Sequence, residues 1–218
     1  MKKRLVIATA LLILLSTYKL QNLILIPIFK VEEVKIDNNY ILKDIEIMKN
    51  LSFLYDSSLI FLKNSNIEEK LKNISFIESF KIKKIYPNKL KITIFEKKPI
   101  AILQHKKKKF YLSENIDLID YQELKNYNNL PIIFGSQESF KSLYINLKKI
   151  NFPINLIKKY YLYELNRWDF ETYKMKIIKL PEKNYNESLK NFMILREKNN
   201  FDKYKVFDYR INNQLILK

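Results

Sequence analysis

The sequence contains no cysteine, one histidine and one glycine among its 218 residues. Without cysteine the chain forms neither disulfide bonds nor thiolate metal sites. The single histidine, His105, excludes a histidine-rich metal cluster, and the single glycine, Gly135, excludes the glycine-rich loops that bind phosphate. The sequence therefore predicts no cofactor and no metal, and several common classes of enzyme are excluded.

Acidic residues are also scarce, since 40 lysines and arginines face 23 aspartates and glutamates, for a net charge of +17. Lysine, isoleucine and asparagine are all abundant, which is typical of AT-rich coding and makes lysine the default surface residue. The run 106–109 and the following Phe110-Tyr111 offer phosphate contacts and stacking surface. Other lysines alternate with apolar residues and form no single stripe, so we predict no nucleic-acid binding. A basic surface still favours anionic neighbours such as phospholipid head groups.

An apolar segment follows the basic tip Lys2-Lys3-Arg4. Extended from residue 5 to residue 26, it is long enough for a helix that crosses roughly 30 Å of hydrocarbon, with Lys19 reaching toward the far interface. The small residues that a signal-peptide cleavage site needs do not follow its apolar core. The sequence therefore predicts a cytoplasmic tip at residues 1–4 and an uncleaved transmembrane helix at residues 5–28, with the rest of the chain exported.

The next region has the pattern of a small α+β domain. Its second half alternates lysine with apolar residues on both sides of a Tyr86-Pro87-Asn88 turn, which predicts a β-hairpin. We expect Asn64, Ser65 or Asn66 to cap the second helix. A three-stranded sheet with two helices on one face satisfies this order. The expected strand, two helices and hairpin lie at residues 29–36, 42–51, 67–71 and 79–97.

Strands dominate the remainder of the chain. We expect a turn near residues 173–175 to divide the strand at 168–180. Tyr160 and Tyr161 lie on opposite faces of the strand at 157–165, and the sequence does not indicate which face is buried. The fold class is therefore α+β, with an N-terminal transmembrane helix, a small β-α-α-β-β domain and a β-rich domain with two or so helices. The expected strands lie at residues 100–104, 110–112, 118–119, 130–135, 157–165, 168–180, 205–210 and 214–217, and the expected helices at 140–150 and 186–198.

No group of residues has the arrangement of an active site. His105 lies beside a lysine run at an expected hairpin tip, where it is solvated. Glu164, Asp169 and Glu171 lie near Trp168, but acids on strands usually face solvent or pair with lysine. We therefore predict no catalytic residues.

The last strand, residues 214–217, is a candidate binding element. A terminal strand often lies at the edge of a sheet, and an unpaired edge is a template for a strand of another chain. The alternative is a strand that only closes its own sheet. The residues alone leave both interpretations open.

Several segments, in order, resemble the FtsQ/DivIB family of bacterial cell-division proteins. FKVEEVKIDNN and IESFKIKKIYPNKLKITIFEKKPIA resemble the first strand and the hairpin of its POTRA (polypeptide-transport-associated) domain. FYLSENIDLID, LPIIFG, RWDFETYKMKIIKLPE and VFDYR resemble landmarks of its β domain. The resemblance implies a POTRA domain at residues 29–97 and an FtsQ-type β domain at 98–218. Relatives often place glycine near Asn115 and Met175. Methionine tolerates left-handed backbone angles poorly, so we expect a different turn at Met175.

The resemblance implies a non-enzymatic scaffold of the divisome. Such a protein passes the inner membrane once, with its N-terminus cytoplasmic and its bulk periplasmic, and links early and late division proteins at the septum. Its last strand pairs with the FtsB–FtsL coiled-coil complex, and no small-molecule substrate is implied. The alternative is a periplasmic POTRA-containing chaperone or an accessory factor of protein export. Carried onto this sequence, the partner-binding residues are Asp208, Tyr209, Arg210, Ile211, Gln214, Leu215, Ile216 and Leu217.

Overall fold

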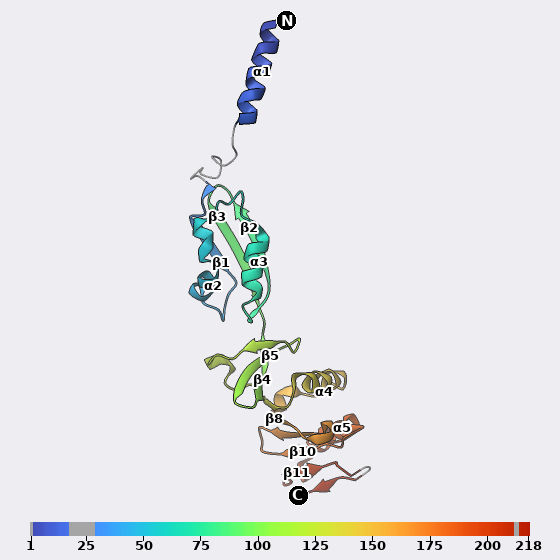
Figure 1. Cartoon of the computed structure of the whole chain (residues 1–218). Helices are drawn as coiled ribbons and strands as arrows, with labels where there is room; N and C mark the ends of the chain where they lie inside the picture. The colour runs from blue at the N-terminus through green and yellow to red at the C-terminus, as the bar shows by residue number, and fades with distance from the viewer. Residues whose placement is uncertain (1, 18–28, 212–213) are drawn as a thin grey trace. The chain divides into compact units, whose positions relative to one another are not determined.

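The computed structural model describes residues 2–17, 29–211 and 214–218, which form two compact units, Met1–Glu96 and Lys97–Lys218 (Figure 1). The chain begins with α1 (Lys2–Thr17). Among the described residues, no helix combines the length and the apolar character that a membrane crossing requires. The predicted transmembrane helix, residues 5–28, includes residues 18–28, which lie outside the described part of the chain.

The first unit contains a three-stranded sheet in the order β1-β3-β2. Strand β1 runs parallel to β3, and β2 and β3 form the predicted antiparallel hairpin. The predicted order of strand, helix, helix, strand, strand is observed, with a short 3-10 turn, η3, between the helices. The elements are β1 (Glu33–Asp37), α2 (Asp44–Asn50), η3 (Ser52–Asp56), α3 (Asn64–Lys72), β2 (Ile77–Ile85) and β3 (Lys89–Glu96).

Alternation along β3 divides the first unit into a buried and an open face. Leu90, Ile92 and Ile94 are fully buried, and the helices contribute Ile47 and Ile67 to the same core. Burying each such side chain contributes about 1.5–3 kcal/mol to folding. The intervening Lys91 and Thr93 are partly exposed, so the period-two pattern of the sequence is confirmed by the structure.

Two local predictions for the first unit are wrong. The first strand starts at Glu33, because Phe29 and Lys30 pair instead with the loop that follows η3: the Leu59 N–H donates to the Phe29 carbonyl at 2.8 Å. Helix α3 begins at Asn64 with Lys63 in the N-cap position and no side-chain cap. The residues expected as caps are therefore inside the helix.

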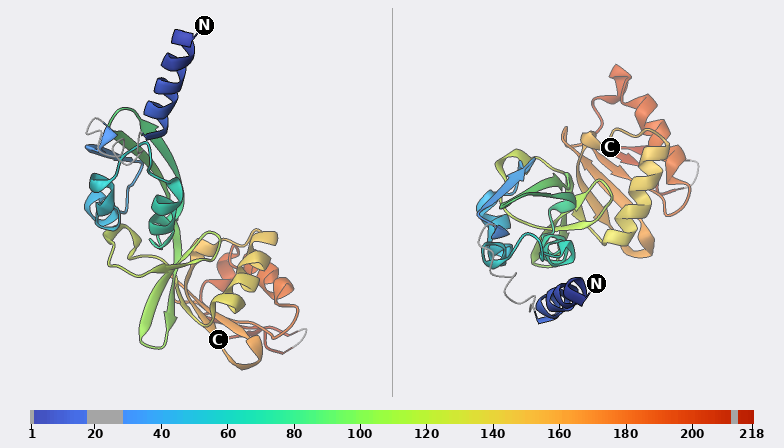
Figure 2. Two further views of the ribbon diagram at one scale, coloured as in Figure 1. Left: turned by 45° about the horizontal axis from the view of Figure 1, so that its top comes forward. Right: turned by 90° about the horizontal axis from the view of Figure 1, so that it is seen from above.

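The second unit is a nine-stranded mixed sheet in the order β12-β11-β10-β9-β8-β7-β4-β5-β6. Helices α4 (Gln137–Lys149) and α5 (Tyr185–Leu195) lie along one of its faces (Figure 2). The strands are β4 (Pro99–His105), β5 (Lys108–Ser113), β6 (Leu118–Asp120), β7 (Ile132–Phe134), β8 (Ile157–Leu162), β9 (Trp168–Thr172), β10 (Ile177–Lys179), β11 (Val206–Asp208) and β12 (Ile216–Leu217).

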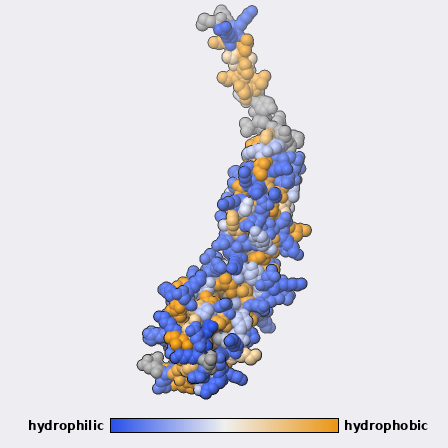
Figure 3. Space-filling view, turned by 180° about the vertical axis from the view of Figure 1, so that it is seen from behind, coloured by the Kyte–Doolittle hydropathy of each residue, from blue (hydrophilic) through white to orange (hydrophobic). Residues whose placement is uncertain are grey.

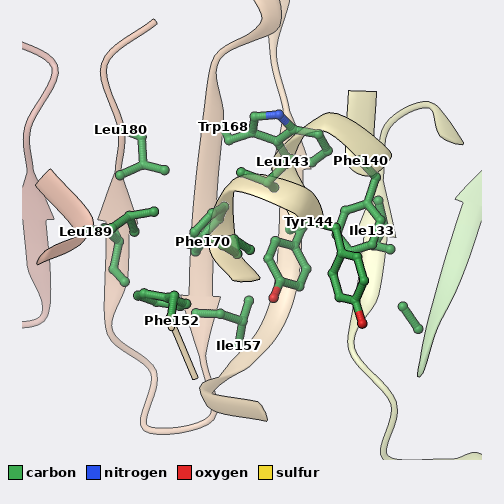
Figure 4. Close-up of a cluster of buried hydrophobic side chains, with 14 of the residues drawn as sticks. Ile133, Phe140, Leu143, Tyr144, Phe152, Ile157, Trp168, Phe170, Leu180 and Leu189 are labelled. Atoms are coloured by element: carbon green, nitrogen blue, oxygen red, sulfur yellow. The ribbon is translucent and has the colours of Figure 1, made fainter. Parts of the chain in front are cut away.

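Aromatic side chains fill the space between this sheet and its helices (Figure 4). The Phe140 ring of α4 meets the Tyr160 ring of β8 edge-on at 5.3 Å, and the Phe192 ring of α5 meets Phe207 of β11 at 5.0 Å. The sequence left open which of Tyr160 and Tyr161 points into the core. Tyr160 is fully buried and points inward, and Tyr161 faces the open side of the sheet.

The only glycine lies where a strand passes close to this core. A Cβ atom at Gly135 would lie 3.0 Å from Leu162 Cβ and 3.1 Å from the ring of Trp168. Contacts this short displace neighbouring atoms in a close-packed interior. Close approach of side chains, and not an unusual backbone angle, therefore explains why glycine occupies this position.

The premise behind the expected change of turn, that Met175 would not adopt a left-handed backbone, is wrong. Met175 adopts a left-handed backbone with φ of 58° in the tight turn between β9 and β10, where its N–H donates to the Thr172 carbonyl at 3.0 Å. In the other glycine-free turn the left-handed residue is Ile116, with φ of 64°, and not Asn115. The chain thus forms these turns without glycine and retains the backbone strain of the left-handed region.

Replacing Met175 by glycine is expected to stabilise the second unit by about 1 kcal/mol, because the left-handed conformation costs glycine nothing. The Met175 side chain is 75% exposed, so little packing is lost. The measurement is the urea midpoint followed by Trp168 fluorescence. The control is Lys174→Gly, because Lys174 is the preceding residue and does not have a left-handed backbone; this variant should lower the urea midpoint. An equal rise of the midpoint in both variants would contradict the explanation.

Candidate functional site

The predicted binding strand lies at the edge of the nine-stranded sheet. Strand β12 pairs antiparallel with β11, with Leu217 opposite Phe207 and Ile216 opposite Asp208. It is the last strand of the order, so within the described residues no strand pairs with its outer side. Residues 212–213, in the turn that leads to β12, lie outside the described part of the chain.

The hydrogen bonds of this pair determine which backbone groups are available at the edge. Lys218 and Val206 exchange both bonds, at 2.9 Å and 3.1 Å. Because bonded and non-bonded pairs alternate in an antiparallel ladder, the N–H and C=O of Ile216 point toward β11, and those of Leu217 point away from it. The backbone of Leu217 therefore faces the open edge.

Side chains of the same segment divide between the core and the open surface. Leu215 and Leu217 pack against the hydrophobic core of the second unit. Ile211 and Ile216 are 51% and 38% exposed, and Gln214 is exposed as well. Ile211 and Ile216 are thus the apolar side chains that an added strand would meet.

Tyr209 anchors the segment from inside. It is buried, and its hydroxyl donates to Asn191 Oδ1 of α5 at 3.0 Å, while burial raises its pKa. Beside it lies a hollow of about 550 Å³ whose wall includes Ile211, Gln214 and Leu215 together with Glu187 of α5. Helix α5 therefore forms part of the surface next to the predicted binding residues, which the sequence had not indicated.

Asp208 and Arg210 form a bidentate ion pair. Asp208 Oδ1 accepts from Arg210 Nε at 2.8 Å, and Oδ2 accepts from the terminal guanidinium nitrogen at 2.7 Å. These hydrogen bonds hold the pKa of the buried Asp208 carboxyl below its usual range. The Arg210 side chain remains 44% exposed, so the pair fixes its direction while leaving it accessible to a second carboxylate.

The ion pair belongs to a polar row on the face opposite the helices. Strand register aligns Tyr161, Asp169, Lys179, Asp208 and Ile216 across β8, β9, β10, β11 and β12. Charges of alternating sign stand next to each other in this row, and cross-strand neighbours of opposite charge attract. The row leads directly to the open edge, and only strand order brings its members together.

Asp169 is the most buried carboxylate of the row. It is 5% exposed, and burial raises its pKa, although Arg167 lies 3.7 Å away and opposes the shift. Its Oδ1 atom has no hydrogen-bond partner among the described residues. The charged form of Asp169 therefore depends on the nearby cations Arg167 and Lys179. These two residues belong to the surface around Arg210, and the sequence did not indicate them.

Lowering the pH is expected to weaken the second unit through Asp208. Its pKa is depressed on folding, so its stabilisation is complete above the ordinary value of 3.8 and is lost as the pH falls through the folded-state value. Stability is measured in urea titrations from pH 6 to about pH 2. Asp208→Asn should be less stable than the unmodified protein at pH 6 and should lose less stability as the pH falls. Asp202→Asn, at a largely exposed carboxylate, is the control. A parallel pH dependence of Asp208→Asn and the unmodified protein would contradict this assignment.

Of the residues considered for catalysis, Asp169 and Glu171 line one hollow, and His105 and Glu164 are not among its lining residues. His105 is exposed at the end of β4 beside exposed lysines, and Glu171 pairs with Lys159 at 3.1 Å. Glu164 lies in the turn between β8 and β9 and is exposed. Among the described residues no group of histidine and acidic side chains is placed to hold a metal ion.

Comparison with known proteins agrees with this architecture. Residues 29–97 match the model of the FtsQ-type POTRA domain. A cell division protein FtsQ of Rickettsia conorii is 29% identical over 193 residues, which cover 85% of this chain and 71% of that protein. The resemblance to the FtsQ family is confirmed.

Other relatives carry the same name. The FtsQ of Rickettsia typhi is 27% identical over 190 residues, covering 85% of this chain and 71% of its own length. The FtsQ of Agrobacterium fabrum is 24% identical over 163 residues, covering 74% of this chain and 51% of its own length. The first unit therefore contains an FtsQ-type POTRA domain, and the similarity to FtsQ extends into the β-rich unit.

Proposed function

We propose that this protein is a non-enzymatic scaffold of the cell-division machinery that binds an FtsB–FtsL-like coiled-coil complex by adding a partner strand to β12. The observation that carries the proposal is the open edge of β12, where the Leu217 backbone points away from its own sheet. A strand added there gains main-chain hydrogen bonds, as in other cases of β-strand addition.

Side chains beside the edge would select the partner. Ile216 and Ile211 present apolar surface, and Arg210, already oriented by Asp208, presents a guanidinium that matches a carboxylate. A partner strand with an apolar residue and an acidic residue at suitable positions complements this arrangement. The proposed binding residues are those predicted from the sequence, Asp208, Tyr209, Arg210, Ile211, Gln214, Leu215, Ile216 and Leu217, with Asp208 and Tyr209 as buried supports.

The division role is supported by the FtsQ names of the relatives and by the FtsQ-type POTRA match. We further propose the inner membrane as the location, with residues 1–4 in the cytoplasm, one transmembrane segment within residues 5–28, and the POTRA domain (29–97) and β domain (98–218) in the periplasm. This rests on the apolar N-terminal sequence and on its flanking basic residues.

Localisation of a fluorescent fusion in dividing cells tests the proposal. The fusion is expected to accumulate at midcell before constriction and to remain there during septation. A fusion of the same chain with Leu217→Pro should still reach the membrane. Uniform envelope fluorescence of the unmodified fusion throughout the division cycle would overturn the divisome role and favour the chaperone or export alternative.

A further inference from the structure

The end of the POTRA domain at which the chain enters carries exposed apolar and aromatic side chains. Tyr86 in the hairpin turn is 58% exposed, and Phe61 and Ile60 in the loop before α3 are 47% and 46% exposed. Ile85 is also exposed. In the space-filling view, hydrophobic surface is visible among hydrophilic residues where the described part of this domain begins (Figure 3).

Contacts between the loop, the hairpin and the first residues of the domain bring these side chains to one end. The Phe29 ring meets the Tyr86 ring edge-on at 6.4 Å, and the Phe29 carbonyl accepts from the Leu59 N–H. Lys84 at the end of β2 donates to the Leu62 carbonyl, which ties the loop to the hairpin. We call this surface, formed by Phe29, Ile60, Phe61, Ile85 and Tyr86, the entry patch.

The sequence on the other side of Phe29 is apolar. Residues 23–28 contain no polar side chain, so no hydrophilic spacer separates the proposed membrane segment from the entry patch. Aromatic residues are favoured at the level of lipid head groups, where their rings sit between hydrocarbon and water. Lys30 and Lys63 flank the patch and are exposed, as suits a surface facing anionic lipid.

We propose that the entry patch rests on the phospholipid head groups of the membrane that holds the N-terminal segment, so that the bilayer surface is a binding partner of the POTRA domain. The inference depends on the membrane location in the proposed function. Contact along this end would restrict the tilt of the domain and set the height of its other elements above the membrane.

The absence of cysteine permits a direct test with single labels on the full-length chain in phosphatidylcholine–phosphatidylglycerol vesicles. Lys63→Cys places a fluorophore beside the entry patch. Lys43→Cys is the matched control, since both lysines are exposed N-cap residues of short helices in the same domain. Lys43 follows Leu42, whose N–H bonds to Glu96 at the far end of β3. Quenching is measured with head-group spin-labelled lipid and, separately, with aqueous iodide.

We expect the lipid-borne quencher to reduce the fluorescence at position 63 and to leave that at position 43 unchanged. Iodide should quench the fluorophore at position 43 more strongly than the one at position 63. Adding Phe61→Ser and Tyr86→Ser to the Lys63→Cys chain should abolish the difference. Equal quenching at both positions in a chain that floats with the vesicles would overturn the inference. Protection of position 63 from both quenchers would assign the patch to a protein surface. A chain that fails to float would refute the membrane location itself.

Discussion

Replacing Leu217 by proline is expected to weaken the proposed binding of an FtsB–FtsL-like complex by on the order of 100-fold, because proline lacks the donor that an added strand would use. The Leu217 N–H points away from β11, so the ladder between Ile216 and Asp208 retains its own donors. The measurement is the dissociation constant for the periplasmic part of the partner complex, combined with hydrogen exchange of the β11 amides.

Two further variants separate the backbone from the side chain. Leu217→Val preserves the N–H and most of the apolar surface, and it should bind nearly as tightly as the unmodified chain. Ile216→Pro removes a donor that points inward, so it should detach β12 from β11 and also prevent binding. Unchanged affinity of Leu217→Pro would refute strand addition at this edge.

Replacing Glu96 by alanine is expected to destabilise the POTRA domain by about 2–4 kcal/mol. The Glu96 carboxylate, at the end of β3, accepts from the N–H groups of Tyr40, Ile41 and Leu42 at 2.8–2.9 Å. These groups belong to the loop that leads into α2, and without the carboxylate the part-buried donors of Ile41 and Leu42 lose their partner. The melting temperature of the domain should fall by about 10 °C or more.

The structure supplies internal controls for this experiment. Trp168, the only tryptophan, lies in the second unit, so its fluorescence transition should be unaffected by Glu96→Ala. Glu33→Ala removes an exposed ion pair with Lys89 and should cost about 1 kcal/mol or less. Hydrogen exchange of the Tyr40, Ile41 and Leu42 amides should accelerate only in Glu96→Ala. Protection equal to that of the unmodified chain would show that the carboxylate does not hold this loop.

Periodicity predicted the strands and helices well, because burial of one face imposes a repeat that a sequence displays directly. The hairpin around Tyr86-Pro87-Asn88 and the helix containing Phe140 follow this pattern and are observed. Boundaries that depend on contacts distant in the sequence were wrong. The first strand starts late because Phe29 pairs with the loop at Leu59, a contact that leaves no local signal.

The candidate site was predictable in one respect and not in another. Its place near the C-terminus followed from a terminal strand and from the resemblance to FtsQ. The neighbours of Arg210 were not predictable, because Asp169 and Lys179 come from strands, and Arg167 from the start of one of them, that only the sheet order places beside it. Likewise, nothing local distinguishes Leu217, whose backbone faces outward, from Ile216, whose backbone faces inward.

The sequence by itself determined the α+β class, the two-part order of the chain, the absence of cysteine-based and histidine-rich metal sites, and the family resemblance, because each depends on composition, local pattern or the order of short segments. The tertiary structure decided which tyrosine of β8 is buried, that Met175 accepts a left-handed backbone, and that Glu96 holds a loop more than fifty residues earlier in the chain. Those features arise from contacts between distant segments, and such contacts are specified only when the whole chain packs.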